Sequence, residues 1–164
     1  MATLGKVSAV ATPRLILICG LPGAGKTTLA RRLALEHSAL SLGADDWMRQ
    51  LGIDLFDEGA RAHLEALQWQ TAQALLNLGR SVILEFGFWL RDERDEKRLG
   101  AKSLGARVEL YVLDVPFEER WRRIEARNAI RTTSEGRITR DQLEAYDHYF
   151  ETPSTEEIAL FDQH

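Results

Sequence analysis

The chain has 164 residues, 45% of them hydrophobic and 28% charged, which is enough for one globular domain with a substantial core. With a formal net charge of −4, the chain lacks the overall basic character of proteins that hold duplex nucleic acid, although a local basic patch is compatible with this charge. No apolar run reaches membrane-spanning length, and the single cysteine, Cys19, excludes an internal disulfide. These features predict a cytoplasmic domain without a membrane partner.

The first predicted element is a strand at residues 16–19, a continuous apolar run of the kind that is buried on both faces of a sheet. Cys19 lies in this run, where we expect it to act as a small buried hydrophobe. Residues 1–13 carry no long apolar stretch, so we expect a flexible leader there and not a signal peptide. We expect residues 14–164 to form a single domain.

The segment 20–28 follows this strand and matches the phosphate-binding P-loop pattern G-x-x-x-x-G-K-[ST]. A helix is expected from about residue 25 to residue 37, so the motif connects a strand to a helix. Its glycines allow N–H groups to point at phosphate oxygens, and the helix N-terminus adds partial positive charge. We expect Lys26 to reach the β- and γ-phosphates and the Thr27 hydroxyl to bind Mg²⁺. The predicted nucleotide-binding residues of the loop are Gly20, Leu21, Pro22, Gly23, Ala24, Gly25, Lys26, Thr27 and Thr28.

Strands and helices alternate along the rest of the chain. Strands are predicted at 39–42, 82–86 and 108–115, and helices at 60–78, 92–104, 117–128 and 139–150. This alternation predicts an α/β fold of the three-layer P-loop NTPase type, with a parallel sheet of four to five strands and helices on both faces. We expect residues 158–161 in the tail to dock on the sheet. Ligands of such folds bind at the carboxyl ends of the strands, where further candidate residues lie.

Two aspartates, Asp45 and Asp46, come just after the predicted strand at 39–42. A hydroxyl that attacks a γ-phosphate benefits from a carboxylate that accepts its proton, and this favours Asp45 as a general base. The alternative is that one aspartate simply caps the short helix that continues through Met48. Both interpretations can hold together if Asp45 is the base and Asp46 is the cap.

Glu85 follows three apolar residues of the strand at 82–86, and burying an unpaired carboxylate there would be costly. We expect it to face Mg²⁺, a substrate hydroxyl or an arginine. The alternative is a structural ion pair with Arg91 or Arg94. Trp47 and Trp89 each follow one of these carboxylates and are candidates for the wall of an acceptor pocket, with core packing as the alternative. The predicted acceptor-site residues are Asp45, Asp46, Trp47, Glu85, Trp89 and Arg91.

A run of arginines begins in the helix predicted at 117–128. At about 100° per residue, Arg120, Arg123, Arg127 and Arg131 lie on one side of that helix. An arginine face beside a buried face, followed by a polar segment, is typical of a lid over triphosphate, and we expect this lid at about 120–140. The alternative is a solvated face neutralised by Glu118, Glu119 and Glu125. We assign Arg123 and Arg127 to nucleotide binding, and Arg127 and Arg131 to catalysis together with Lys26 and Asp45.

With these residues in place, the chain from about residue 15 to residue 153 resembles the small P-loop kinases grouped with polynucleotide kinase, zeta toxin and chloramphenicol phosphotransferase. In that group an aspartate soon after the second strand is the general base, which implies this role for Asp45 or Asp46. The acidic residue that ends the third strand of zeta toxin resembles Glu85. The arginine-rich kinase lid resembles Arg127 and its neighbours. The sequence has no N-K-x-D motif, which would specify guanine. The resemblance therefore implies ATP as the nucleotide, together with Mg²⁺.

The sequence therefore predicts an ATP-dependent kinase that moves the γ-phosphate to a hydroxyl group of a small molecule. A polynucleotide or RNA 5′-hydroxyl kinase is the first alternative. Met48 stands where polynucleotide kinases carry an arginine, and the net charge of −4 also disfavours nucleic acid, whereas the lid arginines favour it. A nucleotide-dependent switch or assembly ATPase is the second alternative. No pattern in the sequence names the acceptor or the oligomeric state.

Overall fold

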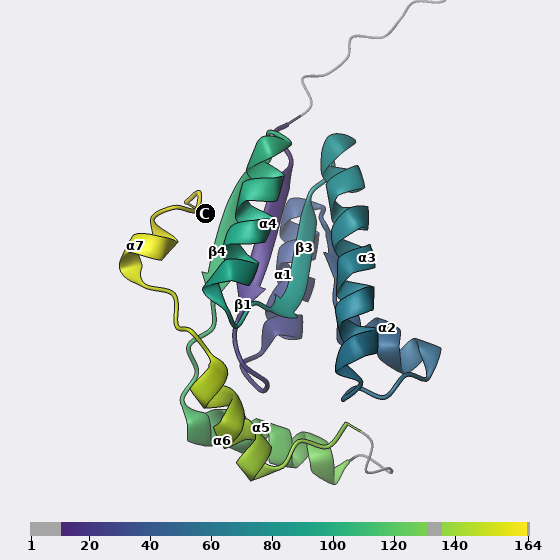
Figure 1. The fold of residues 1–164 in the computed structure, drawn as a ribbon, viewed down its shortest axis with the longest axis vertical. Coiled ribbons are helices and arrows are strands. Elements are labelled where there is room, and N and C mark those ends of the chain that lie inside the picture. The colour runs from purple at the N-terminus through teal and green to yellow at the C-terminus, as the bar shows by residue number, and fades with distance from the viewer. Residues whose placement is uncertain (1–10, 131–135, 164) are drawn as a thin grey trace, which may run out of the picture.

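Four parallel strands form one sheet in the order β2–β3–β1–β4 within residues 11–130 and 136–163, which the structure describes (Figure 1). The structure is a computed structural model. Most of the predicted leader, residues 1–10, lies outside the described residues. The strands confirm the predicted α/β fold of the P-loop NTPase type, and their bounds are β1 (Arg14–Cys19), β2 (Leu40–Leu42), β3 (Val82–Gly87) and β4 (Arg107–Val112).

The central strand β1 is fully buried from Leu15 to Cys19, as its apolar run predicts. Burial raises the pKa of the Cys19 thiol to about 11, so this side chain is an inert part of the core. β1 pairs with β4 in unbroken register, but its pairing with β3 shifts between Leu17 and Cys19. The shift is a bulge at the carboxyl end of β3, where a re-aimed strand is often found next to a functional site.

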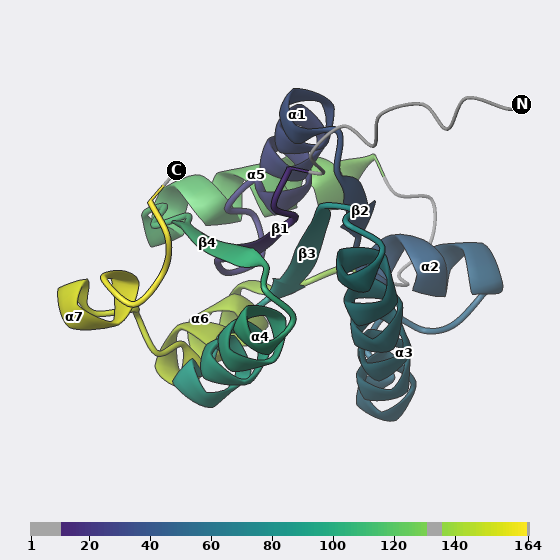
Figure 2. The same cartoon turned by 90° about the horizontal axis from the view of Figure 1, so that it is seen from above.

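Helices cover both faces of the sheet, as predicted (Figure 2). The helix α1 (Lys26–His37) lies on one face, where Ala30 and Leu33 pack with isoleucines of β1 and β3. The helices α3 (Glu58–Asn77) and α4 (Arg91–Ser103) lie on the opposite face and contribute Trp69, Ala72 and Ala101 to a larger core cluster. None of the helices in the described residues is long and apolar enough to cross a membrane.

Three more helices lie near the carboxyl ends of the strands: α2 (Ala44–Leu51), α5 (Phe117–Ala129) and α6 (Arg140–Tyr149) (Figure 1). Thr139 caps α6 in a capping box with Gln142, which explains why the helix starts where it does. Residues 131–135 between α5 and α6, and with them the predicted catalytic Arg131, lie outside the described residues.

The tail after α6 docks on the core through Phe161, which is buried, and carries the short helix α7 (Thr155–Ile158). Ile158 and Leu160, which we also expected to dock, are exposed. The main-chain N–H of Asp162 donates to the carbonyl of Val108 at 2.8 Å, and its carboxylate accepts from the N–H of Val108 at 2.7 Å. Asp162 therefore satisfies the main-chain groups of Val108 at the edge of β4, and the described part of the chain has no fifth strand.

Several element boundaries differ from the prediction by one to three residues, and two of these differences have an identifiable cause. β4 ends at Val112, three residues earlier than the predicted end of this strand. The N–H of Leu113 still donates to the carbonyl of Cys19 at 2.8 Å, and after this residue the chain leaves the sheet. α3 begins at Glu58, earlier than predicted, because the Asp57 carboxylate caps it by accepting from the N–H of Ala60 at 2.9 Å.

Candidate active site

The phosphate loop, residues 20–28, runs from the carboxyl end of β1 into the first turn of α1, as predicted. The N–H of Gly20 donates to the carbonyl of Gly87 at 2.9 Å, which fastens the start of the loop to β3. Gly23 has a φ of +81°, and a Cβ atom there would lie only 2.7 Å from the carbonyl oxygen of Arg120 on α5. Only glycine fits this backbone conformation and this close approach. The N-cap of α1 is Gly25, so the positive end of the helix faces the loop.

Lys26 is the charged group of the loop. Its Nζ donates to the carbonyl of Leu21 at 3.1 Å, which holds the ammonium within the loop. Burial lowers the pKa of Lys26 to about 8, while the negative charges of Asp45 and Glu85 act in the opposite direction and the charge of Arg127 adds to the lowering. Residues predicted from four separate segments therefore act on one another at the carboxyl ends of the strands.

The Thr27 hydroxyl is exposed in the first turn of α1. Mg²⁺ is usually held by one or two protein oxygens together with waters and substrate phosphates, and a P-loop hydroxyl is a suitable ligand of this kind. Within residues 11–130 and 136–163, no group of three or more His, Cys, Asp or Glu side chains is arranged to hold a metal ion.

Asp45 and Asp46 both lie in the first turn of α2. The alternative that Asp46 caps this helix is wrong, because Gly43 is the N-cap and no side chain caps it. Asp46 pairs instead with Arg49 at 2.7 Å and is exposed. Partial desolvation disfavours ionisation of Asp45, whose side chain is about half exposed. The charge and hydrogen bond of Arg61, together with the charges of Arg49 and Lys26, outweigh it and keep the pKa of Asp45 below its usual value. Asp45 is therefore ionised, and its negative charge acts on the ammonium of Lys26.

Three residues of α3 belong to this region and were not predicted: Arg61, Glu65 and Gln68. Arg61 Nη1 lies 2.8 Å from Asp45 Oδ1 and 4.0 Å from Glu65 Oε1. Burial raises the pKa of Glu65 to about 7. Gln68 is fully buried and donates to the carbonyl of Gly43 at 3.3 Å. The available signal was a polar residue, Gln68, at a position of the helical pattern that faces the core.

Glu85 accepts a hydrogen bond of 2.5 Å from the Ser41 hydroxyl of the neighbouring strand β2. The alternative ion pair with Arg91 or Arg94 is wrong. Arg94 is buried and pairs with Glu157, with 2.6 Å between Nε and Oε1, and Arg91 lies 3.5 Å from Asp95. Glu85 thus remains on the Lys26 side, where its charge raises the pKa of the ammonium.

The two tryptophans have different surroundings. Trp89 follows β3, lies against the backbone of Gly87 and packs on Tyr146 of α6, with 4.9 Å between the ring centroids. It therefore links the end of β3 to the helix pair α5–α6. Trp47 is exposed on α2, so the alternative of core packing is wrong for this residue.

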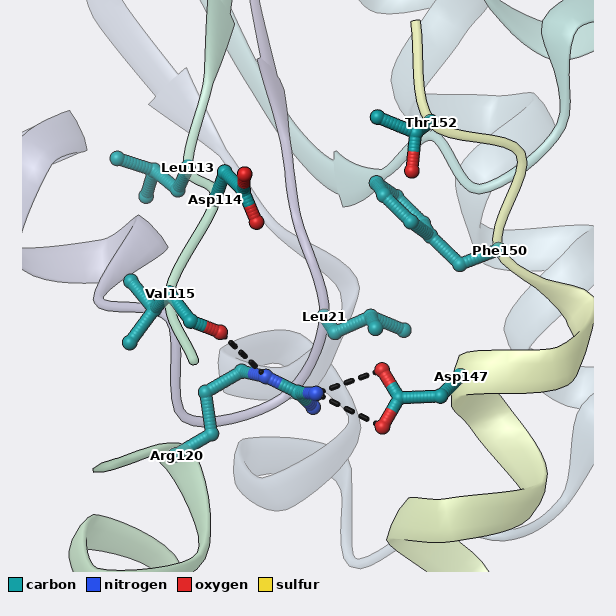
Figure 3. A pocket seen from close by; sticks show the side chains of 8 residues that line it. All are labelled: Leu21, Leu113, Asp114, Val115, Arg120, Asp147, Phe150 and Thr152. Atoms are coloured by element: carbon teal, nitrogen blue, oxygen red, sulfur yellow. Dashed lines mark hydrogen bonds and ion pairs between the residues drawn. The ribbon is translucent and has the colours of Figure 1, made fainter. Parts of the chain in front are cut away.

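The predicted arginine face divides into two parts. Arg120 is buried, donates to the carbonyl of Val115 at 2.9 Å and pairs with Asp147 of α6 at 2.6 Å, so it is structural (Figure 3). The sequence argument considered only nearby glutamates as partners and missed this aspartate. Arg123 donates to the carbonyl of Gly23 at 3.2 Å and so lies at the phosphate loop, although it also pairs with Glu119 at 2.9 Å, as the alternative allowed. The charge of Arg127 contributes to the lowered pKa of Lys26.

A small pocket of about 130 Å³ lies beside the phosphate loop, between the segment after β4 and α6 (Figure 3). The Arg120 guanidinium lies between Val115 and Asp147 at one side of it. Neither Lys26 nor Asp45 lines this pocket. Its lining residues are Leu21, Leu113, Asp114, Val115, Arg120, Asp147, Phe150 and Thr152.

The profile of a protein family described as AAA domain matches residues 15–153. None of the curated proteins matches the sequence. Kti12 from Chaetomium thermophilum, solved in complex with ADP-AlF3, is similar with a TM-score of 0.69 and 21% identity over 87% of this chain and 82% of that chain. A chain of the Pnkp1/Rnl/Hen1 RNA repair complex has a TM-score of 0.68 and 22% identity over 84% of this chain and 44% of that chain. The APS kinase CysC from Mycobacterium tuberculosis, in complex with AMPPNP and APS, has a TM-score of 0.58 and 25% identity over 78% of this chain and 77% of that chain.

Proposed function

Because the chain belongs to the AAA domain family and is similar to P-loop kinases, we propose that it is an ATP-dependent kinase that transfers the γ-phosphate to a hydroxyl group of a small molecule. The observation that carries this proposal is the phosphate loop, in which Lys26 Nζ donates to the carbonyl of Leu21 at 3.1 Å. The charges of Asp45, Glu85 and Arg127 shift the pKa of this ammonium. A phosphate-binding cation, an ionised carboxylate and a lid arginine are the groups that a phosphoryl transfer to an alcohol requires.

In the proposed reaction the acceptor oxygen forms a bond to the γ-phosphorus while the bond to the β-phosphate oxygen breaks. Lys26 and the loop N–H groups bind the β- and γ-phosphates, and Arg123 and Arg127 bind them from the side of α5. The acceptor proton passes to the carboxylate of Asp45, which is ionised at neutral pH because its pKa is lowered. Thr27 would hold Mg²⁺, which neutralises phosphate charge when bound. Arg131 stays a prediction, since it lies outside the described residues.

The remaining predicted residues surround the acceptor in this proposal. In this proposal Glu85 would contact the acceptor hydroxyl or help to hold Mg²⁺. Trp47 is exposed on α2 and Trp89 is partly exposed after β3, and in this proposal both supply aromatic surface to the acceptor. Arg91 and Asp46 are each engaged with a neighbouring side chain.

A polynucleotide or RNA 5′-hydroxyl kinase is the second candidate, and the similarity to a chain of an RNA repair complex favours it. The acidic net charge of −4 disfavours it, because each phosphate of a polynucleotide contacts positive charge in typical complexes. A switch or assembly ATPase would hydrolyse ATP without transferring phosphate.

The test is a screen of hydroxyl compounds with γ-labelled ATP, in which sugars, nucleosides, amino alcohols and a 5′-hydroxyl oligonucleotide are separate arms. We expect label in a small molecule above the hydrolysis background, and none with Lys26→Ala. Label in the oligonucleotide alone would establish the second candidate. Release of labelled phosphate, with no labelled acceptor in any arm, would contradict both kinase candidates.

A further inference from the structure

One face of α3 packs against the start of α2. Arg61 and Gln68 are seven residues apart, so two helical turns place them on the same side of α3. Leu64 lies between them, is buried, and packs in one apolar cluster with Ala44 and Met48 of α2. This apolar contact fixes the two helices together, and a polar side chain on each side of it reaches the first turn of α2.

Arg61 is held at both ends of its guanidinium. Nη2 donates to the carbonyl oxygen of Leu55 at 2.9 Å, and Nη1 lies 2.8 Å from Asp45 Oδ1. Leu55 belongs to the connection between α2 and α3 and packs on the same apolar cluster. Because the main chain anchors one side of the guanidinium, the other side presents a fixed positive charge to Asp45.

The two carboxylate oxygens of Asp45 therefore have different surroundings. Oδ1 is engaged by Arg61, whereas Oδ2 lies 3.7 Å from Arg49 Nη2, which is beyond hydrogen-bond distance. The Asp45 side chain is 55% exposed. An acceptor hydroxyl can thus reach Oδ2 while Arg61 keeps hold of Oδ1.

Gln68 fixes the backbone just before Asp45. Its Nε2 donates to the carbonyl oxygen of Gly43 at 3.3 Å, and its Oε1 is buried with no hydrogen-bond partner within the described residues. A buried oxygen without a partner destabilises a fold, and an apolar side chain of the same size would avoid this cost. The value of the Gln68 amide therefore lies in its one hydrogen bond, which it donates to Gly43, the N-cap of α2.

We propose that Arg61 and Gln68 are positioning residues for Asp45: Arg61 fixes its carboxylate through Oδ1, and Gln68 fixes the turn that carries it. This proposal rests on the proposed role of Asp45 as the base that serves the acceptor. In this proposal each residue acts through Asp45 and not on the substrate itself. Misplacing a catalytic group by about 1 Å costs on the order of a hundredfold in rate, so transfer depends on both contacts.

The first experiment follows the Asp45 carboxyl carbon by NMR in the full chain, without nucleotide or acceptor, and assigns its signal with Asp45→Asn. In the wild type we expect the pKa of this carboxyl group to lie below its usual value. In Arg61→Gln its pKa rises, because the main positive partner is lost. Arg61→Lys restores part of the difference. Arg98→Gln is the matched control, since Arg98 also pairs with an aspartate, Asp95, at 2.7 Å but lies on α4.

The second experiment measures label transfer from γ-labelled ATP to the compound that accepts label in the screen. We expect Arg61→Gln to slow transfer about ten- to a hundredfold at unchanged ADP affinity, and to add nothing in a chain that already carries Asp45→Asn. Gln68→Met should slow transfer without lowering stability to urea.

An Asp45 pKa that does not move in Arg61→Gln would overturn the proposal, as would additive losses in the double variant. If Gln68→Met lowers stability to urea along with the transfer rate, Gln68 has a structural role. That result would overturn the part of the proposal that concerns Gln68. If Asp45→Asn is itself fully active, the proposed base is wrong. The NMR result would still decide whether Arg61 fixes the Asp45 carboxylate, so the two failures are distinguishable.

Discussion

The phosphate loop is held by its main chain, whereas the acceptor side, by which we mean the first turn of α2 and the α3 residues that contact it, is held by side chains. In the loop, the N–H of Gly20 donates a hydrogen bond to the backbone of β3, and Gly23 lies against the backbone of α5. On the acceptor side the contacts are Arg61 with Asp45 and Gln68 with Gly43.

This difference has a consequence for substitutions. A backbone cradle binds any nucleotide phosphate in the same way, and it fails as a whole when its conformation is disturbed. A site held by side-chain pairs can be changed one contact at a time, with graded effects on rate. We therefore expect the two regions to respond differently to single substitutions, and the following predictions test that difference.

The largest effect is expected for Lys26→Ala. It removes the ammonium that neutralises the β- and γ-phosphates but leaves the glycine-based cradle, so we expect a folded protein whose transfer rate falls by about three to five orders of magnitude. Circular dichroism and label transfer measure the two properties. Lys102→Ala is the control, since Lys102 is an exposed lysine near Asp162 on the far side of the fold. Normal turnover in Lys26→Ala would contradict the role of this residue.

Arg127→Ala should have the next largest effect. Charge on the transferred phosphate is stabilised more in the transition state than in the ground state, so we expect turnover to fall by about two to three orders of magnitude and ADP affinity by much less. Arg122→Ala is the matched control from the same helix, because Arg122 is 75% exposed and pairs with Glu119. Equal losses of turnover and ADP affinity would make Arg127 an ordinary nucleotide-binding residue.

Gly23→Ala and Gly52→Ala separate the cost of backbone conformation from the cost of the close approach. Both glycines have positive φ, +81° and +70°, so the backbone conformation alone should cost each variant about 1–2 kcal/mol of unfolding free energy, and the close approach adds to this cost in Gly23→Ala. A Cβ at position 23 also meets the Arg120 carbonyl at 2.7 Å, whereas at position 52 it meets nothing within 4 Å. We expect ADP affinity, measured by calorimetry, to fall more than about tenfold only in Gly23→Ala. Equal affinities would show that the contact with α5 does not shape the cradle.

The smallest effect concerns pH. The free protein holds Lys26 with a pKa of about 8, and bound phosphates favour its charged form, so nucleotide binding takes up a proton above pH 8. ADP affinity is therefore full below that pKa and declines as the pH rises through it, by about tenfold between pH 7 and pH 9. Lys26→Ala should abolish this dependence. A flat profile in the wild type would show that Lys26 stays charged.

The two regions also differ in how far the sequence determines them. The phosphate loop could be predicted because its nine residues are contiguous and sit between a strand and a helix that are both visible as local patterns. The position of Asp45 followed from the same local pattern. Its partner could not be predicted, because Arg61 reaches it only when α3 packs on α2.

Pairing across elements limited the other predictions as well. Arg120 and Arg127 are seven residues apart on the same side of one helix, yet Arg120 is buried against Asp147 of α6. For Glu85 the sequence left an ion pair with an arginine as the alternative, but the parallel pairing of β2 with β3 supplies Ser41 as its partner. Such partners depend on the packing of distant segments, which a local pattern does not contain.

The most direct measurement compares Asp45→Asn with Asp46→Asn for two quantities, ADP affinity by calorimetry and label transfer to an acceptor. Asparagine keeps the size of the side chain and removes its ability to take a proton. For Asp45→Asn we predict near-normal ADP affinity and transfer reduced by about two to four orders of magnitude. Asp46→Asn should differ little from the wild type, because Asp46 is exposed and does not cap α2. Full transfer activity in Asp45→Asn, or a loss of ADP affinity as large as the loss of transfer, would contradict a carboxylate that serves the acceptor alone.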